Sequence, residues 1–296
     1  WVIVTCTFFM MKNLPGTPFD AERFSIMTPQ QQERVLEMYG LNDSLPMQYV
    51  KYIKNMLKGD LGTSFTYVNQ DVSKVITGRL GPSALIGIQA VLIGLAIGLI
   101  LGILAAWKHN SGIDYFTMIL AVLGVSVPNF VAAALLQYYI GLKWGALPVG
   151  FWTGWNCSVL PSIALSFSAT AMVARFMRTE MLDVLDQDYI VTARAKGLSQ
   201  MKVLMRHAVR NSILPVVTIL GPIVVNLMTG SLAVENIFSI PGIGSLFVDC
   251  IKANDYPVIM GITIFYAAFY MLIVLLVDLA YSLIDPRIRL AKGKES

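Results

Sequence analysis

Long runs of apolar residues dominate the hydrophobic pattern of this chain, and short polar stretches separate them. An α-helix needs about 20 apolar residues to cross the ~30 Å of hydrocarbon in a membrane. Four runs reach that length without a charged residue, at 84–107, 115–142, 211–234 and 256–277. The pattern therefore predicts an all-α integral membrane protein.

Two weaker apolar segments add to these four. Residues 159–174 are shorter than a full span, but Phe176 and Met177 extend them past Arg175, whose long side chain can reach the membrane surface. The opening stretch WVIVTCTFFMM (1–11) is too short to cross and lacks the small-residue cleavage site of a signal peptide. We expect it to be the end of a first span whose beginning precedes this numbering. The pattern thus predicts six transmembrane helices.

The distribution of Lys and Arg assigns the two sides of the membrane, because short cytoplasmic loops carry an excess of both. The loop 175–210 holds seven of them and the tail 287–294 holds four, to which Lys108 adds one. The loops on the alternate side hold only Lys143 and Lys252. This asymmetry, twelve against two, places the basic loop and the C-terminus in the cytoplasm.

Residues 12–80 are then expected outside the cytoplasm, as a small helical cap between the first and second spans. Thr28 followed by Pro29 is typical of a helix start, and Gly40 of its end. Two further helices are expected at 46–58 and 71–80. The expected organisation is 1–11, the truncated end of the first transmembrane helix; 12–80, the extracytoplasmic cap; and 81–296, the transmembrane domain with a cytoplasmic loop at 183–210.

Common catalytic and metal-binding motifs are absent. The sequence contains no G-x-x-x-x-G-K-[ST], H-E-x-x-H or G-x-S-x-G. Cys6, Cys157 and Cys250 match no metal-ligand spacing, although a bridge between the last two is left open. An ion-driven carrier usually has a carboxylate or histidine near the centre of the membrane. The candidate for such a proton relay here is Asp278, but it lies near the inner end of the last span. We therefore expect no enzymatic activity, no cofactor and no metal in this chain, and an external energy source for any transport.

Small and polar residues within the spans indicate how the helices pack. Gly94, Gly98 and Gly102 repeat at four-residue spacing, which lets a second helix approach closely, in this chain or in another subunit. Pro128 and Pro222 interrupt two spans and either line a polar path or form simple kinks. Candidate pathway-lining residues, which could equally form hydrogen bonds between helices, are Asn129, Gln137, Asn226 and Ser231.

The densest basic cluster is DYIVTARAKGLSQMKVLMRHAVRNSILP, residues 188–215. Residues 188–196 favour a helix whose acidic first residue suits the helix dipole. Gly197 then ends this helix, since glycine readily adopts the left-handed conformation found after a helix C-terminus. A second, amphipathic helix is expected to follow, with an apolar stripe of Met201, Leu204, Met205 and Ala208 and a basic stripe of Lys202, Arg206 and Arg210.

A basic loop that only contacts lipid and fixes topology would account for the charge. It would not account for the glycine turn or for the small Ala193 and Ala195 beside it. Small side chains on an exposed helix suit insertion into a groove of a partner protein.

Several motifs, in this order along the chain, resemble the permease subunits of binding-protein-dependent ABC importers, particularly the oligopeptide/dipeptide branch. They are PGTPFD, GDLGTSF, the basic loop, VENIFSIPGIGSLFVDCIKANDYPVIMG and VDLAYSLIDPRIR, and they cover nearly the whole chain. The general importer loop carries Glu-Ala-Ala and then Gly, whereas here Val191 and Thr192 precede Ala193 and Gly197. This departure is similar to the peptide-branch variant and puts the Glu-dependent contacts of the general motif in doubt.

The resemblance implies six transmembrane helices of the type I ABC importer permease kind, with a cytoplasmic loop that docks onto an ATPase subunit. It implies that the chain is the permease subunit of an ATP-driven oligopeptide importer in the bacterial plasma membrane, where it forms half of the translocation pathway. The residues implied in ATPase coupling are Asp188, Tyr189, Thr192, Ala193, Arg194, Ala195, Lys196, Gly197, Leu198 and Arg206.

The implied partners are a second homologous permease, two ATP-binding subunits that hold ATP and Mg, an extracytoplasmic peptide-binding protein, the peptide and membrane lipid, with no nucleic acid. The cap and the segment 235–257 are candidates to contact the binding protein or to gate the outer mouth. The alternatives are a dipeptide, nickel-chelate or glutathione cargo, a stand-alone secondary transporter, and a membrane scaffold or sensor. A secondary transporter usually has a paired ionisable residue at mid-membrane, and a scaffold would tolerate a bulky residue at position 197.

Overall fold

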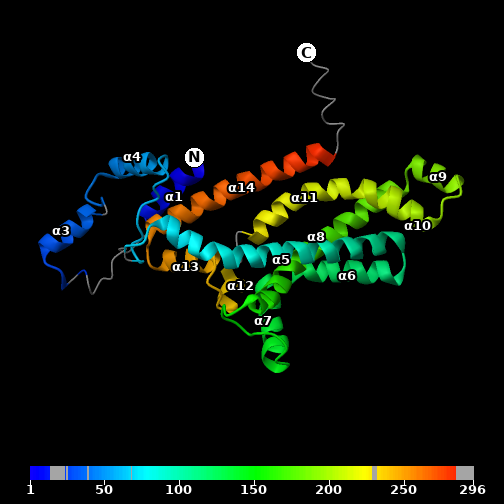
Figure 1. The fold of residues 1–296 in the computed structure, drawn as a ribbon, viewed down its shortest axis with the longest axis horizontal. Helices are drawn as coiled ribbons and strands as arrows, with labels where there is room; N and C mark the ends of the chain where they lie inside the picture. The colour runs from blue at the N-terminus through cyan, green and yellow to red at the C-terminus, as the bar shows by residue number, and fades with distance from the viewer. Residues whose placement is uncertain (14–23, 25, 39, 68, 229–231, 285–296) are drawn as a thin grey trace, which may run out of the picture. The chain divides into compact units, whose positions relative to one another are not determined.

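The computed structural model describes residues 1–13, 24, 26–38, 40–67, 69–228 and 232–284, and helices form nearly all of their regular structure (Figure 1). This agrees with the predicted all-α class. The elements are α1 (Val2–Lys12), α3 (Pro29–Met38), α4 (Leu45–Met56), α5 (Val72–Trp107), α6 (Gly112–Ser126), α7 (Asn129–Leu136), the π-helix η1 (Gln137–Lys143), the 3₁₀-helix η2 (Trp155–Ser158), α8 (Val159–Leu185), α9 (Asp188–Ala195), α10 (Gln200–Lys202), the π-helix η3 (Val203–Val209), α11 (Arg210–Met228), α12 (Leu232–Ile237), α13 (Ile243–Lys252) and α14 (Tyr256–Ile284).

Four stretches of the described chain are long and apolar enough to cross a membrane, namely Val72–Trp107, Trp155–Leu185, Gln200–Ile237 and Tyr256–Leu279. A fifth span is formed if α6 and the following helix Asn129–Lys143 count together, although they meet at 100°. The expected end of a first span is α1, an apolar helix of 11 residues. The count of six therefore stays a prediction.

The bend between α6 and α7 lies at Pro128, the residue that the sequence marks as an interruption of the span 115–142. Val127 leaves the helical conformation, with φ −82° and ψ 117°, directly before Pro128. Proline disfavours the helical conformation in the residue that precedes it and cannot donate a backbone hydrogen bond. At Pro82 the opposite occurs, because α5 runs through this proline without a break. The third cap helix and the second span are therefore one helix of 36 residues.

The contacts divide the chain into two compact units. Unit 1 comprises residues 1–81 and 242–268, and unit 2 comprises 82–241 and 269–296. In unit 2, α8 is the central helix, with α6, α7 and α11 packed against it. Its side chains Leu160, Met177 and Met181 are almost fully buried.

The three glycines at four-residue spacing bring α5 against α8 within this chain. A Cβ atom added to Gly94 would lie 2.7 Å from the Cβ of Ala169, and one added to Gly98 2.7 Å from the Cβ of Val173. At Gly102 the added atom would lie 2.6 Å from the carbonyl oxygen of Ala174. No real Cβ fits at such distances, so any larger residue would force the two backbones apart.

In unit 1, helix α3 starts in the way that the sequence predicts. The amide of Thr28 donates to Gln31 Oε1 at 2.9 Å, and the amide of Gln31 lies 3.4 Å from Thr28 Oγ1, which is a capping box. A first cluster of buried residues, with α1 and α14 at its centre, contains Val4, Phe8 and Met260. A second joins the start of α5, through Val72 and Ile76, to α13 and α14.

A buried carboxylate connects two of the sequence motifs. Asp255, which is fully buried, precedes α14 and accepts hydrogen bonds from the hydroxyl of Ser64 and from the amides of Thr66 (3.0 Å) and Phe65 (3.2 Å). Ser64 Oγ in turn accepts from the amide of Tyr67 at 2.8 Å. Several hydrogen bonds to a buried carboxylate compensate for its lost hydration. The GDLGTSF segment of the cap is thereby fixed to the segment before the last span.

We expect Asp255→Asn to loosen this loop, because an amide carries one acceptor oxygen where the carboxylate carries two. The loss corresponds to about 1–3 kcal/mol of local stability. Hydrogen exchange measures it directly, as lower protection of the amides of residues 65–67. Asp249→Asn is the matched control, because Asp249 is exposed on the neighbouring α13. Equal protection in the two variants would contradict this role of Asp255.

Candidate functional site

The basic loop forms a helical hairpin, called the basic hairpin below, from Asp188 to Val209. Its first helix, α9, begins with Asp188 and ends at a Schellman motif. The amide of Gly197 donates to the carbonyl of Arg194 at 2.9 Å, and that of Leu198 to the carbonyl of Ala193 at 3.4 Å. Gly197 has a φ of +78°, the left-handed conformation that the sequence predicts.

The two arms of the hairpin are held together by a small apolar cluster. Ile190 and Ala193 on α9 are buried against Val203 on η3, with Val184 and Leu185 of α8 beside them. This corrects the interpretation of Ala193 as a small residue presented to a partner, because its side chain is only 6% exposed. A small side chain is needed at this position because η3 packs against it. Ala195 remains exposed.

The second arm differs from the predicted amphipathic helix in which residues it buries. Leu204 and Ala208 are buried as predicted, whereas Met201 and Met205 are 50% and 53% exposed. The cause is the π-helix η3, in which hydrogen bonds run from i to i+5 and residues on one face are spaced more widely than in an α-helix. Val203 therefore joins Ala208 on the buried face.

Strong contacts connect the hairpin to the helices of unit 2. Leu204 and Ala208 belong to the main buried cluster, together with Met177 and Met181 of α8. At the start of α11, the hydroxyl of Ser212 lies 2.9 Å from the carbonyl of Ala208 and 3.2 Å from the carbonyl of Glu180. The hairpin is thus part of the helical core that follows it.

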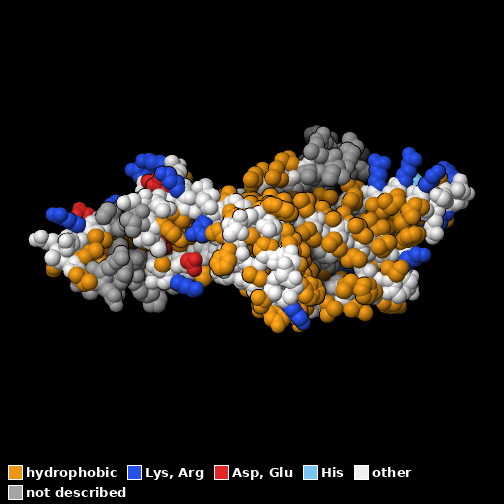
Figure 2. All heavy atoms as spheres, turned by 60° about the horizontal axis from the view of Figure 1, so that its bottom comes forward, with side chains coloured by type: hydrophobic (Ala, Val, Ile, Leu, Met, Phe, Trp, Pro, Cys, Tyr) orange, Lys and Arg blue, Asp and Glu red, His pale blue; other side chains and the backbone are white. Residues whose placement is uncertain are grey.

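The outer face of the hairpin combines positive charge with exposed apolar groups. Figure 2 shows Lys and Arg side chains gathered over the α9–α10 end of the molecule. Within the described part of the chain, neither the exposed cations of the hairpin nor the adjoining Arg210 form an ion pair. The hairpin's own exposed cations are Arg194, Lys196, Lys202 and Arg206. Tyr189 (42%), Leu198 (37%) and the two exposed methionines lie among them. Tyr189 Oη also accepts a hydrogen bond from Asn211 at 3.2 Å, and the hydroxyl of Thr192 donates back to the carbonyl of Asp188 at 3.0 Å.

The described candidate pathway residues lie in different surroundings, and their role in a pathway stays a prediction. Gln137 donates to two backbone carbonyls, of Val149 at 2.6 Å and Ile237 at 2.7 Å, so it anchors a loop. Asn129 is partly buried at the start of α7, and Asn226 is exposed on α11. Ser231 lies outside the described residues.

An ion pair that the sequence analysis missed joins α6 to α8. The buried carboxylate of Asp114 accepts hydrogen bonds from Arg178 Nε at 2.6 Å and Arg178 Nη2 at 2.8 Å. His109 Nδ1 lies 3.1 Å from the same carboxylate. The amide of Asn110 donates to it at 3.0 Å. The sequence does contain a signal for this pair. Asp114 directly precedes the uncharged run 115–142, and Arg178 lies at the same, cytoplasmic end of another predicted span.

A second missed residue is Glu235, which is 2% exposed. The hydroxyl of Ser83 donates to its Oε1 at 2.7 Å, across the interior of unit 2. From the sequence, Glu235 is expected at the start of the outer segment 235–257, not in the interior. By contrast, the proposed proton-relay residue Asp278 lies exposed on α14. Cys6, Cys157 and Cys250 are all free thiols.

Comparison with known proteins identifies the family. The model of the family described as binding-protein-dependent transport system inner membrane component matches residues 98–290. The chain belongs to this family. The dipeptide transport system permease protein DppB of Lactococcus lactis subsp. cremoris is 45% identical over 98% of this chain and 95% of its own length. The corresponding Bacillus subtilis protein is 44% identical over 98% and 94%, and the oligopeptide transport system permease protein OppB of Salmonella typhimurium 39% identical over 98% and 94%.

Solved structures of two ABC transporters share the fold of this permease. The MetNI methionine ABC transporter, described in inward-facing conformations, gives a TM-score of 0.62 at 14% identity, over 72% of this chain and 97% of the other. An amino acid ABC transporter gives 0.54 at 19% identity, over 73% and 94%. The predicted type I importer permease fold is confirmed. The protein is a permease component of a peptide ABC transporter and is embedded in the membrane.

We predict that Arg178→Gln destabilises the protein strongly, because it leaves the carboxylate of Asp114 buried without its counter-charge. Breaking such a pair costs about 3–5 kcal/mol. Thermal unfolding in detergent should show the loss, and the double variant Asp114→Asn, Arg178→Gln should recover part of it. Arg175→Gln, an exposed position three residues earlier on α8, should have little effect. Similar unfolding temperatures for Arg178→Gln and Arg175→Gln would contradict the stabilising role of the Asp114–Arg178 pair.

Proposed function

We propose that this chain is one of two homologous permease subunits of an ATP-driven peptide importer, and that its basic hairpin docks onto an ATP-binding subunit. The observation that carries the proposal is the construction of the hairpin. A glycine turn presents cations that form no ion pair with any described residue, together with exposed apolar side chains, on one face, while the opposite face is packed into the core. Family membership and the names of the relatives support the same assignment.

The packing suggests how the hairpin would transmit motion. Ile190 and Val203 hold its two arms together, and Leu204 and Ala208 fix the second arm to α8. A displacement of the hairpin by its partner would therefore move α8 and α11 instead of being absorbed by a flexible loop. Arg194 and Lys196 would set the register of docking, since charges contribute more to specificity and association rate than to affinity.

ATP and Mg would be bound by two partner subunits, and this chain would supply no catalytic group. The excess of Lys and Arg supports a cytoplasmic hairpin and a cytoplasmic C-terminus in the bacterial plasma membrane. The cap and the segment 235–257 would then face the extracytoplasmic peptide-binding protein. The bonds from Ser64 and its neighbours to Asp255 support their acting as one body.

Short peptides are the cargo that we propose. The resemblance of the sequence motifs implies oligopeptides, with dipeptides as an alternative. Two relatives named as dipeptide permeases are 45% and 44% identical to this chain, and two named as oligopeptide permeases are 38% and 39% identical. These identities favour the dipeptide alternative.

Substitution of Gly197 tests the docking. Gly197→Trp should abolish co-purification of the ATP-binding subunits and reduce peptide uptake at least about tenfold, because a bulky side chain would project from the docking face. A Cβ at Gly197 meets no atom of the chain within 4 Å, so the side chain itself has room. Subunit stoichiometry by mass spectrometry, after purification in mild detergent, is the measurement.

Gly59→Trp is the matched control. Gly59 has a φ of +83° and equally open surroundings, so it shares the backbone strain of the test position, but it belongs to the cap. This variant should keep its ATP-binding subunits. Gly197→Asn, which tolerates the left-handed conformation, should keep them as well. Retention of both subunits by Gly197→Trp would refute the docking role.

A further inference from the structure

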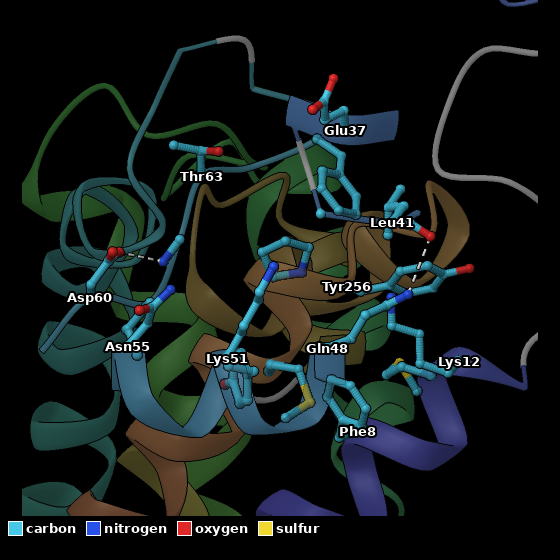
Figure 3. A pocket seen from close by; sticks show the side chains of 18 residues that line it. Phe8, Lys12, Glu37, Leu41, Gln48, Lys51, Asn55, Asp60, Thr63 and Tyr256 are labelled. Carbon is cyan, nitrogen blue, oxygen red and sulfur yellow. Dashed lines mark hydrogen bonds between the residues drawn. The ribbon is translucent and has the colours of Figure 1, made fainter. Parts of the chain in front are cut away.

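A pocket of about 360 Å³ lies within unit 1, between α1, α3, α4, the loop 60–65 and the first turn of α14 (Figure 3). Its volume falls in the ~300–1,000 Å³ range of small-molecule sites. Both charged and aromatic side chains line it. Nothing in the coupling mechanism above uses this pocket.

Lys12 is the notable group in its wall. The ammonium lies 5.8 Å from the ring centroid of Phe8 and 5.6 Å from that of Tyr256, so two aromatic rings flank it. Its side chain is partly buried, and no carboxylate among the described residues pairs with it. The other lysine of the pocket, Lys51, is bound to Asp43 at 2.6 Å. Lys12 is thus a positive charge in an aromatic environment, with no counter-ion among the residues that the structure describes.

A second group in the same wall also has no hydrogen-bond partner among the described residues. The hydroxyl of Tyr52 is buried and accepts or donates no hydrogen bond within the described chain. Buried polar groups are normally hydrogen-bonded, so this hydroxyl carries a free-energy cost beside the pocket. The ring centroid of Tyr52 lies 5.8 Å from that of Phe8, and Phe8 is one of the two rings that flank the Lys12 ammonium.

Negative charge lies on the other side of the pocket. Figure 3 shows Asp60 across the pocket from Lys12, with Glu37 at the edge. Asp60 Oδ1 accepts from the amide of Gly62 at 2.8 Å, which fixes its orientation, and both carboxylates are exposed. A ligand with a carboxylate at one end, an apolar body and an ammonium at the other end would match this distribution.

We propose that this pocket binds a short peptide, with its C-terminal carboxylate on the Lys12 ammonium. The apolar side chain of its last residue would lie against Phe8 and Tyr256, and its amino group would face Asp60. The proposal rests on the proposed function, to which it adds a peptide site in the cap. Lys12 would otherwise serve only to stabilise the C-terminal end of α1, a purely structural role that the experiment separates from binding.

The test uses alanyl-phenylalanine and its C-terminal amide as probes. Binding to the full chain, in nanodiscs together with whichever subunits co-purify with it, is measured by calorimetry without ATP or binding protein. Lys12→Gln should weaken binding of the free acid about tenfold and leave the already weak binding of the amide unchanged. Lys12→Arg should restore most of the affinity, because it retains the charge. Lys54→Gln, an exposed lysine of α4 outside the pocket, should bind as the unaltered protein does.

Unchanged binding of the free acid in Lys12→Gln would overturn the proposal, as would an equal loss for acid and amide, which indicates a structural role. A variant that binds the dipeptide normally but loses only its binding protein would overturn it too. Because neither ATP nor the docking hairpin takes part, peptide binding can succeed when the ATP-binding subunits do not co-purify. Failure of this site and failure of the proposed function are therefore distinguishable.

Discussion

Helices in hydrocarbon gain little from burying apolar side chains against one another, because lipid tails are equally apolar. Close backbone contact and the van der Waals attraction it permits must hold them together. In this permease α8 collects those contacts, from α5 through Gly94 and Gly98, and from α6 through Gly124, where an added Cβ would lie 2.9 Å from that of Ala171. The position of the other elements of unit 2 depends on this packing.

The same helix continues into the part of the chain that we assign to coupling. Its last turns carry Arg178, which pairs with the buried Asp114, and then Met181, which packs against the base of the basic hairpin. One ion pair and one apolar contact thus fix the end of α8. A lever needs this stiffness, because energy from a partner subunit reaches the spans only if the joint does not yield.

Sequence reasoning succeeded where one local rule decides the structure. Run length predicted the apolar helices, the four-residue glycine spacing predicted close packing, and the need for a left-handed residue predicted the turn at Gly197. It was less successful where the outcome depends on contacts distant in the chain. The pairing of Asp114 with Arg178 spans 64 residues, and the burial of Asp255 depends on a loop that lies 191 positions earlier.

Departures from regular helix geometry account for the other differences. The π-helix η3 moved Met205 to the exposed face and Val203 to the buried one, which a 3.6-residue period cannot foresee. Proline acted in two ways: Pro128 ends a helix and Pro82 does not. Tertiary packing decides between these outcomes, because neighbouring groups within a membrane domain can satisfy the backbone that proline leaves unpaired.

Site-specific photo-crosslinking in intact membranes tests the central claim most directly. A photoreactive amino acid at position 198, beside the glycine turn, should crosslink to a protein that contains a P-loop, and ATP should change the yield. The same group at position 57, an exposed site in the cap, should not reach that protein. Crosslinks from position 198 to lipid alone, or to the same proteins as from position 57, would contradict the account of the basic hairpin as the joint between this permease and its energy source.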